Sequence, residues 1–564
     1  MNQLRYCSSF LCIGLAFFYS GSMIIADAAP RDAFDDLIAF TDTDAGGQLL
    51  DDTTFTVTRT ASKEVVITLL SDLGFFPLLQ QNFFLRSNIL RSRSLLDYPE
   101  FIPWRHDKDK RALYIDLFFN ETPRMFFNRE SSNICSYLAV AQPSFIAILD
   151  TIFDNVRDFL GGVTPIEKDK FLRLIDLFKT FTVQERRLGL MIGGKTKFDR
   201  WHFHIMAPWY YLERNHFVDL AVQEDLEALM ADIFGAPKTP EEAELALKRQ
   251  HQFEDDYLIS DKFGIGDTRI YCDYPIIKNK YLSTRLGFLA TIPTAFAMKK
   301  GLKGSNFKRV QFPQSLNLQE LIDAAIAANT NGQPVADVQA LGYALDVLSN
   351  FSAMVLESPM GNGGHLGLGG YFRNRSPLSL FIKQDWARRV YMRSFMSLEY
   401  LFPATEWRSF RVPVQEALFN ERNLSETDNQ TVINSNYEFI LQQLNDRLFP
   451  KALQATVHPG FIFRWSSQFI YEGNYHGFSF GTDTYVRNKE SFSHIDATPL
   501  TKRIIDIDTA RNPISYQSKV CASVFWKIEK PDKLWTIALM GDYTFMNTGI
   551  GADFSLVLKT NVMF

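Results

Sequence analysis

The sequence predicts an all-β chain, a transmembrane antiparallel up-and-down β-barrel of about 12–14 strands with long helical loop insertions. Three observations predict this fold. Apolar and polar residues alternate over many segments of about 9–11 residues, the length of a strand that crosses a bilayer. Aromatic residues make up 14% of the chain, and they favour strands and interfaces between apolar and aqueous phases. Short and long connections between these segments alternate, as they do in membrane barrels.

The N-terminus predicts a cleavable secretory signal peptide over residues 1–28. Arg5 precedes the apolar stretch CSSFLCIGLAFFYSGSMII, and Ala26 and Ala28 form a small-x-small cleavage pattern. An uncleaved membrane anchor is the alternative. No later segment is a run of roughly 18 apolar residues, so no membrane helix is expected. An exported chain without such a helix is either soluble beyond the inner membrane or inserted as a barrel.

Residues 29–110 form an N-terminal segment with two possible roles. Its stretches EVVITLL and QQNFFLRSNIL could be extra strands, which would bring the barrel to about fourteen, or parts of a plug. The barrel itself is expected over residues 111–564. The net charge of −5 is small, so no nucleic-acid partner is predicted.

Alternating segments follow one another from residue 111 to the C-terminus. In order they are RALYIDLFF, RRLGLMIGG, RWHFHIMAPW, GDTRIYCDY, YLSTRLGFLATI, GGHLGLGGYF, ARRVYMRSFMSLEYLF, GFIFRWSSQFIYE, YHGFSFGTDTYV, SKVCASVFWKIE, LWTIALMGDYTF and FSLVLKTNVMF. An even number of strands places both barrel termini at the same end, the periplasmic one. The last segment is the predicted closing strand, which pairs with the first.

The connections differ strongly in length. GKTKFD, IIKNK, EGN, EKPDK and NTGIGA are short turns, while NRSPLSLFIKQD and 488–513 are of medium length. Long insertions are expected at 120–185, 212–263, 294–363 and 403–457. Segments such as LNLQELIDAAIAAN repeat apolar residues with helical spacing, so these insertions are predicted to be helical. They could cap the outer mouth, fold inward as plugs or simply decorate the loops.

The signal peptide, the alternating strands and a terminal aromatic residue together resemble the single-chain outer-membrane β-barrel proteins of Gram-negative bacteria. The resemblance implies an outer-membrane location and contact with outer-membrane lipid. It also implies recognition of the last strand by the barrel assembly machinery, for which the matching residues are Phe564, Val562 and Leu558. The GIGDTRIYCDYPI segment resembles uptake barrels for aromatic or fatty compounds, in which a Gly-Asp pair opens a strand.

Charged residues of both signs occupy the predicted lumen-facing positions in near balance. The principal candidates are Arg269, Asp273, Arg285, Arg389, Arg393, Glu399, Arg464, Glu472, Lys519, Asp542 and Lys559. The full inward set, over which the two signs nearly balance, also includes Arg373, Lys527, Asp267, Asp483, Glu529 and Asp553. One reading is a polar conduit in which opposed charges create a transverse field. The other is an internal salt-bridge network that fills the barrel. A one-sided set of charges would have predicted an ion preference, and this set does not.

Tryptophan, histidine and glycine residues provide further candidate sites. Trp residues near strand ends are expected to form aromatic girdles at the two membrane interfaces. They are Trp201, Trp209, Trp386, Trp465, Trp526 and Trp535. His202 and His204 share a strand face, but no local ligand completes a metal site, so two lumen-facing polar residues are expected there. GNGGHLGLGG lacks the spacing of a phosphate-binding loop. No metal or cofactor is predicted.

The predicted function is a channel or uptake pore for the passive passage of small solutes, and not an enzyme. An outer-membrane enzyme such as a phospholipase-like barrel is one alternative, and it requires a Ser-His pair with an orienting polar group. A structural or adhesive surface protein and a soluble exported β-sandwich are the others. The sequence does not identify the solute.

Overall fold

The computed structural model describes residues 111–124, 182–217, 259–278, 282–300, 360–380, 382–410, 451–508, 510–530 and 533–564, with single positions elsewhere. The predicted signal peptide over 1–28 and the segment 29–110 lie outside these residues. The choice between extra strands and a plug for 29–110 is therefore still open. Within the described ranges, no helix is both long and apolar enough to span a membrane.

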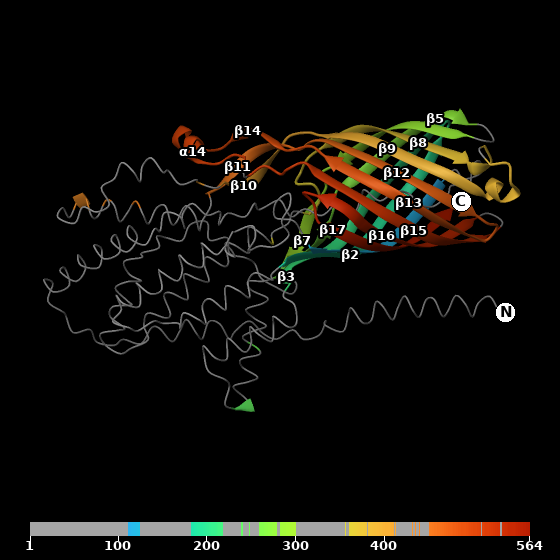
Figure 1. The fold of residues 1–564 in the computed structure, drawn as a ribbon, viewed down its shortest axis with the longest axis horizontal. Coiled ribbons are helices and arrows are strands. Elements are labelled where there is room, and N and C mark those ends of the chain that lie inside the picture. Colours follow the sequence, from blue (N-terminus) through green and yellow to red (C-terminus); the bar gives the residue numbers. More distant parts are fainter. Residues whose placement is uncertain are drawn as a thin grey trace. The chain divides into compact units, whose positions relative to one another are not determined.

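Twelve antiparallel strands form a closed barrel, as predicted (Figure 1). The strands, in chain order, are β1 Arg111–Arg124, β2 Thr182–Phe198, β3 Trp201–Phe217, β5 Thr268–Lys278, β6 Ser283–Ile292, β8 Gly367–Pro377, β9 Val390–Leu401, β12 Gly460–Glu472, β13 His476–Arg487, β15 Ser515–Glu529, β16 Leu534–Thr548 and β17 Ala552–Met563. Each strand pairs with its neighbours in chain order among these twelve. All twelve contain one of the predicted alternating segments.

The first and last strands close the ring. β1 pairs with β17 from Ala112 opposite Met563 to Glu121 opposite Phe554. The closure continues one residue further, because the backbone N–H of Phe564 donates to the Arg111 carbonyl oxygen at 3.1 Å. The predicted pairing of FSLVLKTNVMF with the first strand and with LWTIALMGDYTF is confirmed.

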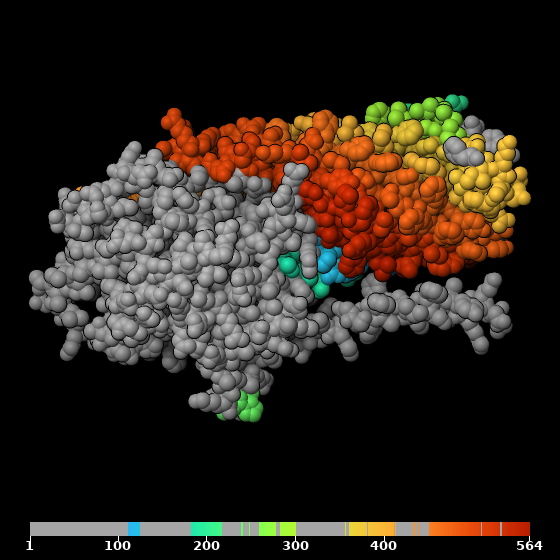
Figure 2. All heavy atoms as spheres, viewed as in Figure 1, coloured from blue at the N-terminus to red at the C-terminus, as the bar shows by residue number. Residues whose placement is uncertain are grey.

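Side chains on each strand alternate between a buried inner face and an exposed outer face. On β1, for example, Leu113, Ile115 and Leu117 are exposed, whereas Tyr114 and Asp116 are buried. Closing the sheet forces one face of every strand inward, so the buried residues line the interior. The outer face is apolar on strand after strand, and Figure 2 shows that it forms a continuous wall where β12, β13, β15 and β16 lie.

The two ends of the barrel differ in their connections. Short turns join β2 to β3, β5 to β6, β12 to β13 and β15 to β16 at the end that contains Arg111 and Phe564, here called the turn end. There β8 and β9 are joined through two short 3-10 segments, η5 Leu378–Leu380 and η6 Asp385–Arg389. The opposite end, the loop end, carries the long connections and one tight turn from β16 to β17. This is the predicted alternation of short and long joins.

Two additional strands continue the wall at the loop end. β4 Ile259–Ile265 precedes β5 and also pairs with β3, while β7 Phe296–Lys300 follows β6 and pairs with β4. The break between β4 and β5 falls at Gly266 and Asp267, opposite Pro208 of β3. Proline has no N–H to donate, and Gly266 instead donates to the Pro208 carbonyl at 2.9 Å. A Cβ on Gly266 would lie 2.7 Å from Pro208 Cγ, so this contact requires glycine.

Part of the predicted helical insertion 403–457 is instead a small antiparallel sheet. It is built from β10 Ala404–Phe410, β11 Lys451–His458 and β14 Ser491–Ile495. Its strands alternate with a two-residue period and cover the apolar cluster around Phe410 and Ile495, which favours strand over helix. The ends of the insertions 212–263 and 294–363 are likewise strand, in β3, β4 and β7.

The remaining predicted helices lie almost entirely outside the described residues, as does the interior of 120–185. Within the described ranges the one α-helix with complete bounds is α14 Pro499–Ile504, in the connection between β14 and β15. Thr498 caps it, since its side chain accepts a hydrogen bond from the Thr501 N–H at 3.2 Å.

Candidate functional site: the interior of the barrel

A row of rings crosses the inner wall from β1 to β9. Tyr114 packs edge-on against His204 with ring centroids 5.2 Å apart, and their Oη and Nε2 atoms are hydrogen-bonded. His204 lies 5.6 Å from Tyr271, which meets Tyr371 edge-on at 5.5 Å, and Tyr371 contacts Phe395 at 5.7 Å. We call these five residues the aromatic row. Edge-on ring packing adds stabilisation beyond area burial alone.

Glycines on the intervening strands make room for the rings. Gly193 of β2 is paired with Tyr114, and a Cβ on it would lie 2.2 Å from the Tyr114 ring. Gly287 of β6 is paired with Tyr371, and a Cβ there would lie 2.5 Å from that ring. Each tyrosine therefore lies flat over its neighbouring strand.

Asp273 connects the aromatic row to the inward charges. Its carboxylate accepts a hydrogen bond from the Tyr371 hydroxyl at 2.9 Å. Arg285 Nη1 lies 3.1 Å from one carboxylate oxygen, and Arg373 Nη1 lies 3.9 Å from the other. A buried carboxylate is costly unless opposite charges and hydrogen bonds surround it, and Asp273 has both.

Two more glutamates bridge strands that are not neighbours. Arg269 of β5 pairs with Glu399 of β9 at 3.2 Å, across β6 and β8. Glu472 of β12 receives Arg375 of β8 at 2.7 Å and also forms an ion pair with Lys527 of β15. These ion pairs link strands that are not neighbours, and their side chains occupy part of the interior.

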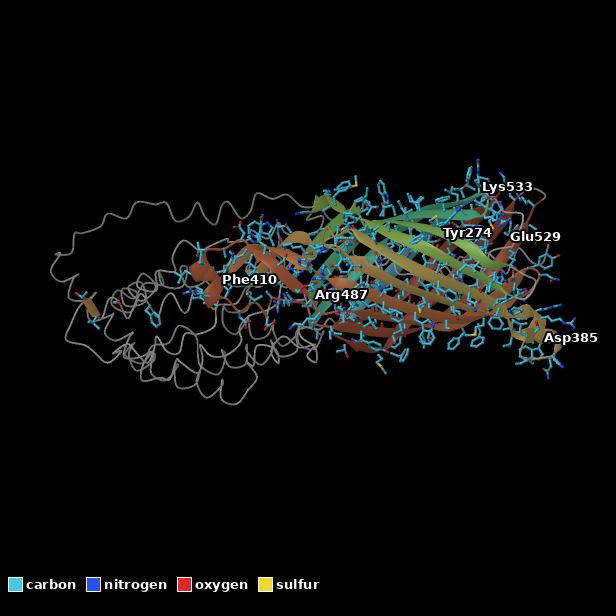
Figure 3. All side chains as sticks on the ribbon, turned by 90° about the horizontal axis from the view of Figure 1, so that it is seen from above. Tyr274, Asp385, Phe410, Arg487, Glu529 and Lys533 are labelled. Carbon is cyan, nitrogen blue, oxygen red and sulfur yellow. The ribbon has the colours of Figure 1, made fainter. Side chains whose placement is uncertain are left out.

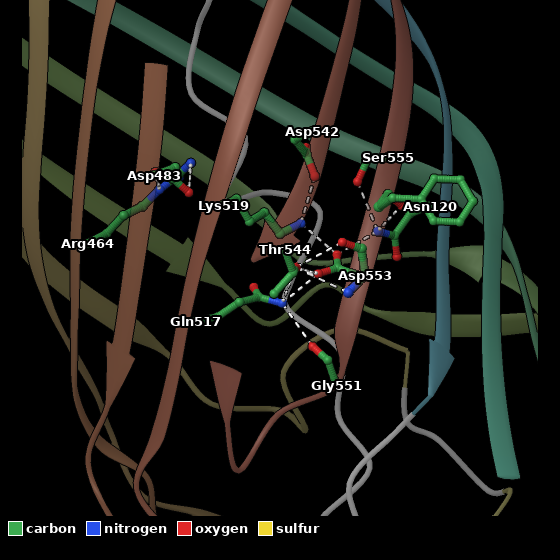
Figure 4. Close-up of polar contacts among 11 residues, drawn as sticks. Asn120, Arg464, Asp483, Gln517, Lys519, Asp542, Thr544, Gly551, Asp553 and Ser555 are labelled. Atoms are coloured by element: carbon green, nitrogen blue, oxygen red, sulfur yellow. Dashed lines mark hydrogen bonds and ion pairs between the residues drawn. The ribbon is translucent and has the colours of Figure 1, made fainter. Parts of the chain in front are cut away.

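A fourth cluster lies on β15, β16 and β17 around Asp553 (Figure 4). Lys519 Nζ lies 2.6 Å from Asp553 Oδ2 and 2.9 Å from Asp542 Oδ1. Gln517 Nε2 donates to Asp553 Oδ1 at 2.5 Å, and Asn120 Nδ2 of β1 donates to Oδ2 at 2.8 Å. The cluster therefore ties the first strand to the last three.

Further pairs extend the same pattern around the wall. Arg464 donates two hydrogen bonds to Asp483, at 2.9 and 3.4 Å, the paired geometry that suits a guanidinium and a carboxylate. Lys559 lies 3.4 Å from Asp116 on the closing pair of strands. These contacts are ion pairs of the kind that the second sequence-based hypothesis, an internal salt-bridge network, expects.

The segment 360–366 reaches the inner wall just before β8. Gly361 N–H donates to the Tyr210 hydroxyl at 3.1 Å, and Asn362 N–H donates to Asp267 Oδ2 at 2.6 Å. Met360 packs in the same buried cluster as Tyr210. Gly361 has a φ of +71° and a Cβ on it would lie 2.5 Å from Asp267, so only glycine fits this approach.

His365 anchors the other end of this segment. Its Nδ1 lies 2.8 Å from the Phe402 carbonyl oxygen, and its Nε2 lies 2.8 Å from Glu406 of β10. Within the stretch GNGGHLGLGG, Gly361 thus serves a close backbone approach, whereas a Cβ on Gly364 would meet nothing within 4 Å. The segment is held between the inner wall and the small sheet.

Ten of the eleven principal lumen-facing candidates are inward. They are Arg269, Asp273, Arg285, Arg393, Glu399, Arg464, Glu472, Lys519, Asp542 and Lys559. Arg389 is different, because it ends η6 at the turn end and is exposed. The alternation counted through ARRVYMRSFMSLEYLF placed it on a strand, whereas β9 begins only at Val390.

The side chains of the six candidate Trp residues lie outside the barrel. Trp201, Trp386, Trp526 and Trp535 are at or near the turn end, whereas Trp209 and Trp465 lie further along their strands. On β17, Leu558, Val562 and the adjoining Phe564 face outward, with Phe564 53% exposed.

Sequence reasoning did not single out the aromatic row. The signal was available, because Tyr114 has the same parity as Asp116 on β1, and Tyr271 the same parity as Arg269 and Asp273 on β5. The predicted lumen-facing set contains only charged residues, so it leaves out the inward aromatic residues.

Neither histidine candidate forms a metal site. His202 and His204 both face inward on β3, and His204 belongs to the aromatic row. In the part of the chain that the structure describes, no group of three or more His, Cys, Asp or Glu side chains could hold a metal ion.

One Ser-His contact occurs in the small sheet. His458 Nε2 lies 2.7 Å from Ser493 Oγ, and both side chains are exposed. Within the described ranges Ser493 is the one side chain that bonds the His458 ring, so no third group orients the imidazole there.

Comparisons with known proteins give structural neighbours alone. Neither a scan of family models nor a search of curated proteins gives a match. An outer membrane channel from Pseudomonas putida F1 is 6% identical, with 83% of this chain and 99% of that chain covered and a TM-score of 0.36. The NanC porin is 9% identical, with coverages of 68% and 93% and a TM-score of 0.22. The Pseudomonas putida toluene transporter TodX is 8% identical, with coverages of 86% and 96% and a TM-score of 0.25. Because these TM-scores are all below 0.5, the fold is established by the strand pairing within the structure and not by its similarity to these proteins.

Proposed function

We propose that this chain is an outer-membrane β-barrel through which small uncharged solutes pass without energy input. The single observation that carries the proposal is the closed ring of twelve strands whose outer face is apolar and whose inner face holds paired charges. A closed ring satisfies every backbone hydrogen bond between strands, which is what hydrocarbon requires of a spanning sheet.

The outer face supports a membrane location. Leu286 is 52% exposed, Phe288 68%, and Leu398 51%, and all three lie in the middle of strands. Soluble proteins rarely expose continuous apolar surfaces of this kind, so a bilayer is the environment that fits. In this proposal residues 1–28 are the signal peptide that directs export, and the turn end faces the periplasm.

The inner face supports a preference for uncharged solutes. An ion that enters would have to compete with contacts such as Arg464–Asp483 and Lys519–Asp553, which are already satisfied. No net field of one sign draws cations or anions inward. The aromatic row offers ring surfaces that a solute with apolar parts can follow.

The segment 360–366 supports a role as a gate. It contacts the inner wall through Tyr210 and Asp267, and its three glycines with positive φ make an alternative backbone path inexpensive. A segment that lies against the inner wall in this way narrows the passage. We place the constriction here.

Liposome swelling tests the proposal. The purified full-length protein is reconstituted, and swelling is compared for an uncharged pentose and for gluconate of similar size. We expect faster swelling with the pentose. Equal impermeability to both, from a protein that shows the heat-dependent electrophoretic shift of an intact barrel, would exclude a channel.

Assembly through the last strand is part of the proposal. Phe564, Val562 and Leu558 lie on the outer face of β17, where the assembly machinery could reach them. Deleting Phe564 should impair membrane assembly while export continues, measured as loss of the heat-dependent shift with unchanged periplasmic appearance. Normal assembly of the truncated chain would remove this role from Phe564.

An outer-membrane enzyme is the second candidate, favoured by the Ser493–His458 contact alone. Hydrolysis of ester-linked lipid by this pair would be lost in Ser493→Ala. Swelling should be unaffected by the same substitution, because Ser493 lies on β14 and not on the barrel wall. Lipase activity that survives in Ser493→Ala would exclude this pair.

A further inference from the structure

The turn end of the barrel carries a rim of exposed basic side chains, and we infer that this rim binds the phosphate groups of anionic phospholipids in the adjoining leaflet. The inference rests on the proposed function in one respect, namely that the barrel spans a membrane. It adds a lipid class and a surface that neither the channel proposal nor the interior requires.

The basic rim comes from three separate turns. It consists of Arg200, Lys383, Arg388, Arg389, Lys530 and Lys533, all exposed. Acidic residues in the sequence of the same turns are fewer, namely Asp199, Asp385, Glu529 and Asp532. The chain as a whole has a net charge of −5, so this end is positive against an overall negative molecule. Figure 3 shows Asp385, Glu529 and Lys533 at one end of the barrel and Arg487 away from it.

Exposed tryptophans adjoin the rim in the sequence and in space. Trp201 follows Arg200 directly, and Trp386 lies in η6 two residues before Arg388. Trp526 and Trp535 flank the turn that holds the two rim lysines. Indole rings sit at the level of lipid headgroups, and longer cationic side chains beyond them reach the phosphates.

The rim charges are available for binding, unlike those of the interior. Arg388 is 77% exposed and its partner Asp385, at 3.6 Å, is 96% exposed, so water screens this pair. Lys519 of the interior, by contrast, is 5% exposed between two carboxylates. Arg200 donates one hydrogen bond to the Tyr274 hydroxyl at 3.2 Å, and a guanidinium has four further N–H donors for a phosphate.

The distribution of the rim favours lipid over a protein partner. The cations lie on the turns β2–β3, β8–β9 and β15–β16, which are separated from one another by two strands each and so are spaced around the whole ring. A leaflet supplies many small anionic groups around the whole circumference. A single acidic protein would need to span the same ring of turns. Each basic residue near an anionic membrane surface increases the association constant for that surface about fivefold.

The experiment measures lipid selectivity of the full-length protein in mixed vesicles. Spin-labelled phosphatidylglycerol and phosphatidylcholine report the relative association constant of each lipid at the barrel surface. The variants are R388Q/R389Q, K530Q/K533Q and their combination. The matched control is K502Q/R503Q, which removes two exposed charges from α14.

We expect the native protein to prefer phosphatidylglycerol several-fold. Each double variant should reduce this preference. The quadruple variant should bring the ratio of the two association constants close to one, and the control should leave the ratio unchanged. A native protein without preference, or a quadruple variant that keeps it, would overturn the inference. The first result would favour an acidic protein as the partner of the rim, and the second would assign the lipid preference to other residues. Heat-dependent mobility is recorded in parallel, because a chain that never inserts contradicts the proposed function, whereas an inserted barrel without lipid preference contradicts this inference alone.

Discussion

Asp553 is the residue on which the interior hydrogen bonds of β15, β16 and β17 converge. Lys519, Gln517, Thr544 and Asn120 all bond its carboxylate. Removing one partner of a buried ion pair leaves an uncompensated charge, which costs far more than the pair itself contributes. The cluster should therefore govern how firmly the last strands are closed.

Asp553→Ala should lower the free energy of unfolding by about 3–5 kcal/mol. The matched control is Asp508→Ala, since Asp508 also pairs with a lysine, Lys489 at 3.3 Å, but is 71% exposed. The Lys489 hydrogen bond lowers the pKa of Asp508, yet solvent screens the pair, so its loss should cost less than about 1 kcal/mol. Urea unfolding in lipid vesicles measures both. Equal effects from the two variants would contradict the role given to burial.

Gly193 offers a second residue-scale test, because the Tyr114 ring occupies the place of its Cβ. Gly193→Ala should destabilise the barrel by about 1–3 kcal/mol through overpacking. Gly194→Ala is the matched control, since its Cβ would meet nothing closer than 3.7 Å. The Gly193 effect should shrink when Tyr114 is also replaced by Ala, and additive effects in this double-mutant cycle would show that ring and glycine are not coupled.

At the scale of elements, two strands are interrupted next to the segment that contacts them. β4 and β5 break at Gly266–Asp267, and β6 and β7 break between Ile292 and Phe296. The 360–366 segment bonds Asp267 at the first break. An interrupted ladder holds fewer fixed hydrogen bonds, so this corner of the loop end is where a segment can shift at the least cost.

Asp267→Ala removes the acceptor for the Asn362 N–H and should raise the open fraction of the gate. We expect an increase in mean conductance of about tenfold if the lost bond is worth about 1.4 kcal/mol, the upper part of the range for one hydrogen bond. Asp199→Ala, on the β2–β3 turn, changes the same charge away from the segment and should leave conductance unchanged. Single-channel recording distinguishes them. Unchanged conductance in Asp267→Ala would remove the gate from segment 360–366.

The elements also show how far the sequence could be read. A two-residue period with apolar outer positions predicted all twelve barrel strands, because lipid imposes the same outer face on each one. The small sheet of β10, β11 and β14 was missed. Its strands pack on a compact cluster around Phe410. They are short and far apart in the chain, so no continuous alternating pattern marks them. Arg389 was misplaced for a related reason, since alternation does not mark where a strand begins.

The sequence does not predict which inward side chains contact each other. Inward charges could be counted, but Arg269 and Glu399 meet across two intervening strands. Such contacts depend on closure and curvature of the ring. The aromatic row required the same knowledge, together with the glycines that let its rings lie flat.

At the scale of the whole molecule, an apolar exterior and a charge-paired interior support the proposal of a barrel that sits in lipid and passes small solutes without selecting between cations and anions. Planar-bilayer recording of the purified protein in a KCl gradient tests this most directly. We expect small, discrete conductance steps with a reversal potential close to zero, because the paired interior charges disfavour the entry of both ions and select neither. A heat-modifiable barrel that gives no steps, or a reversal potential near the value for a purely cationic or anionic pore, would contradict it.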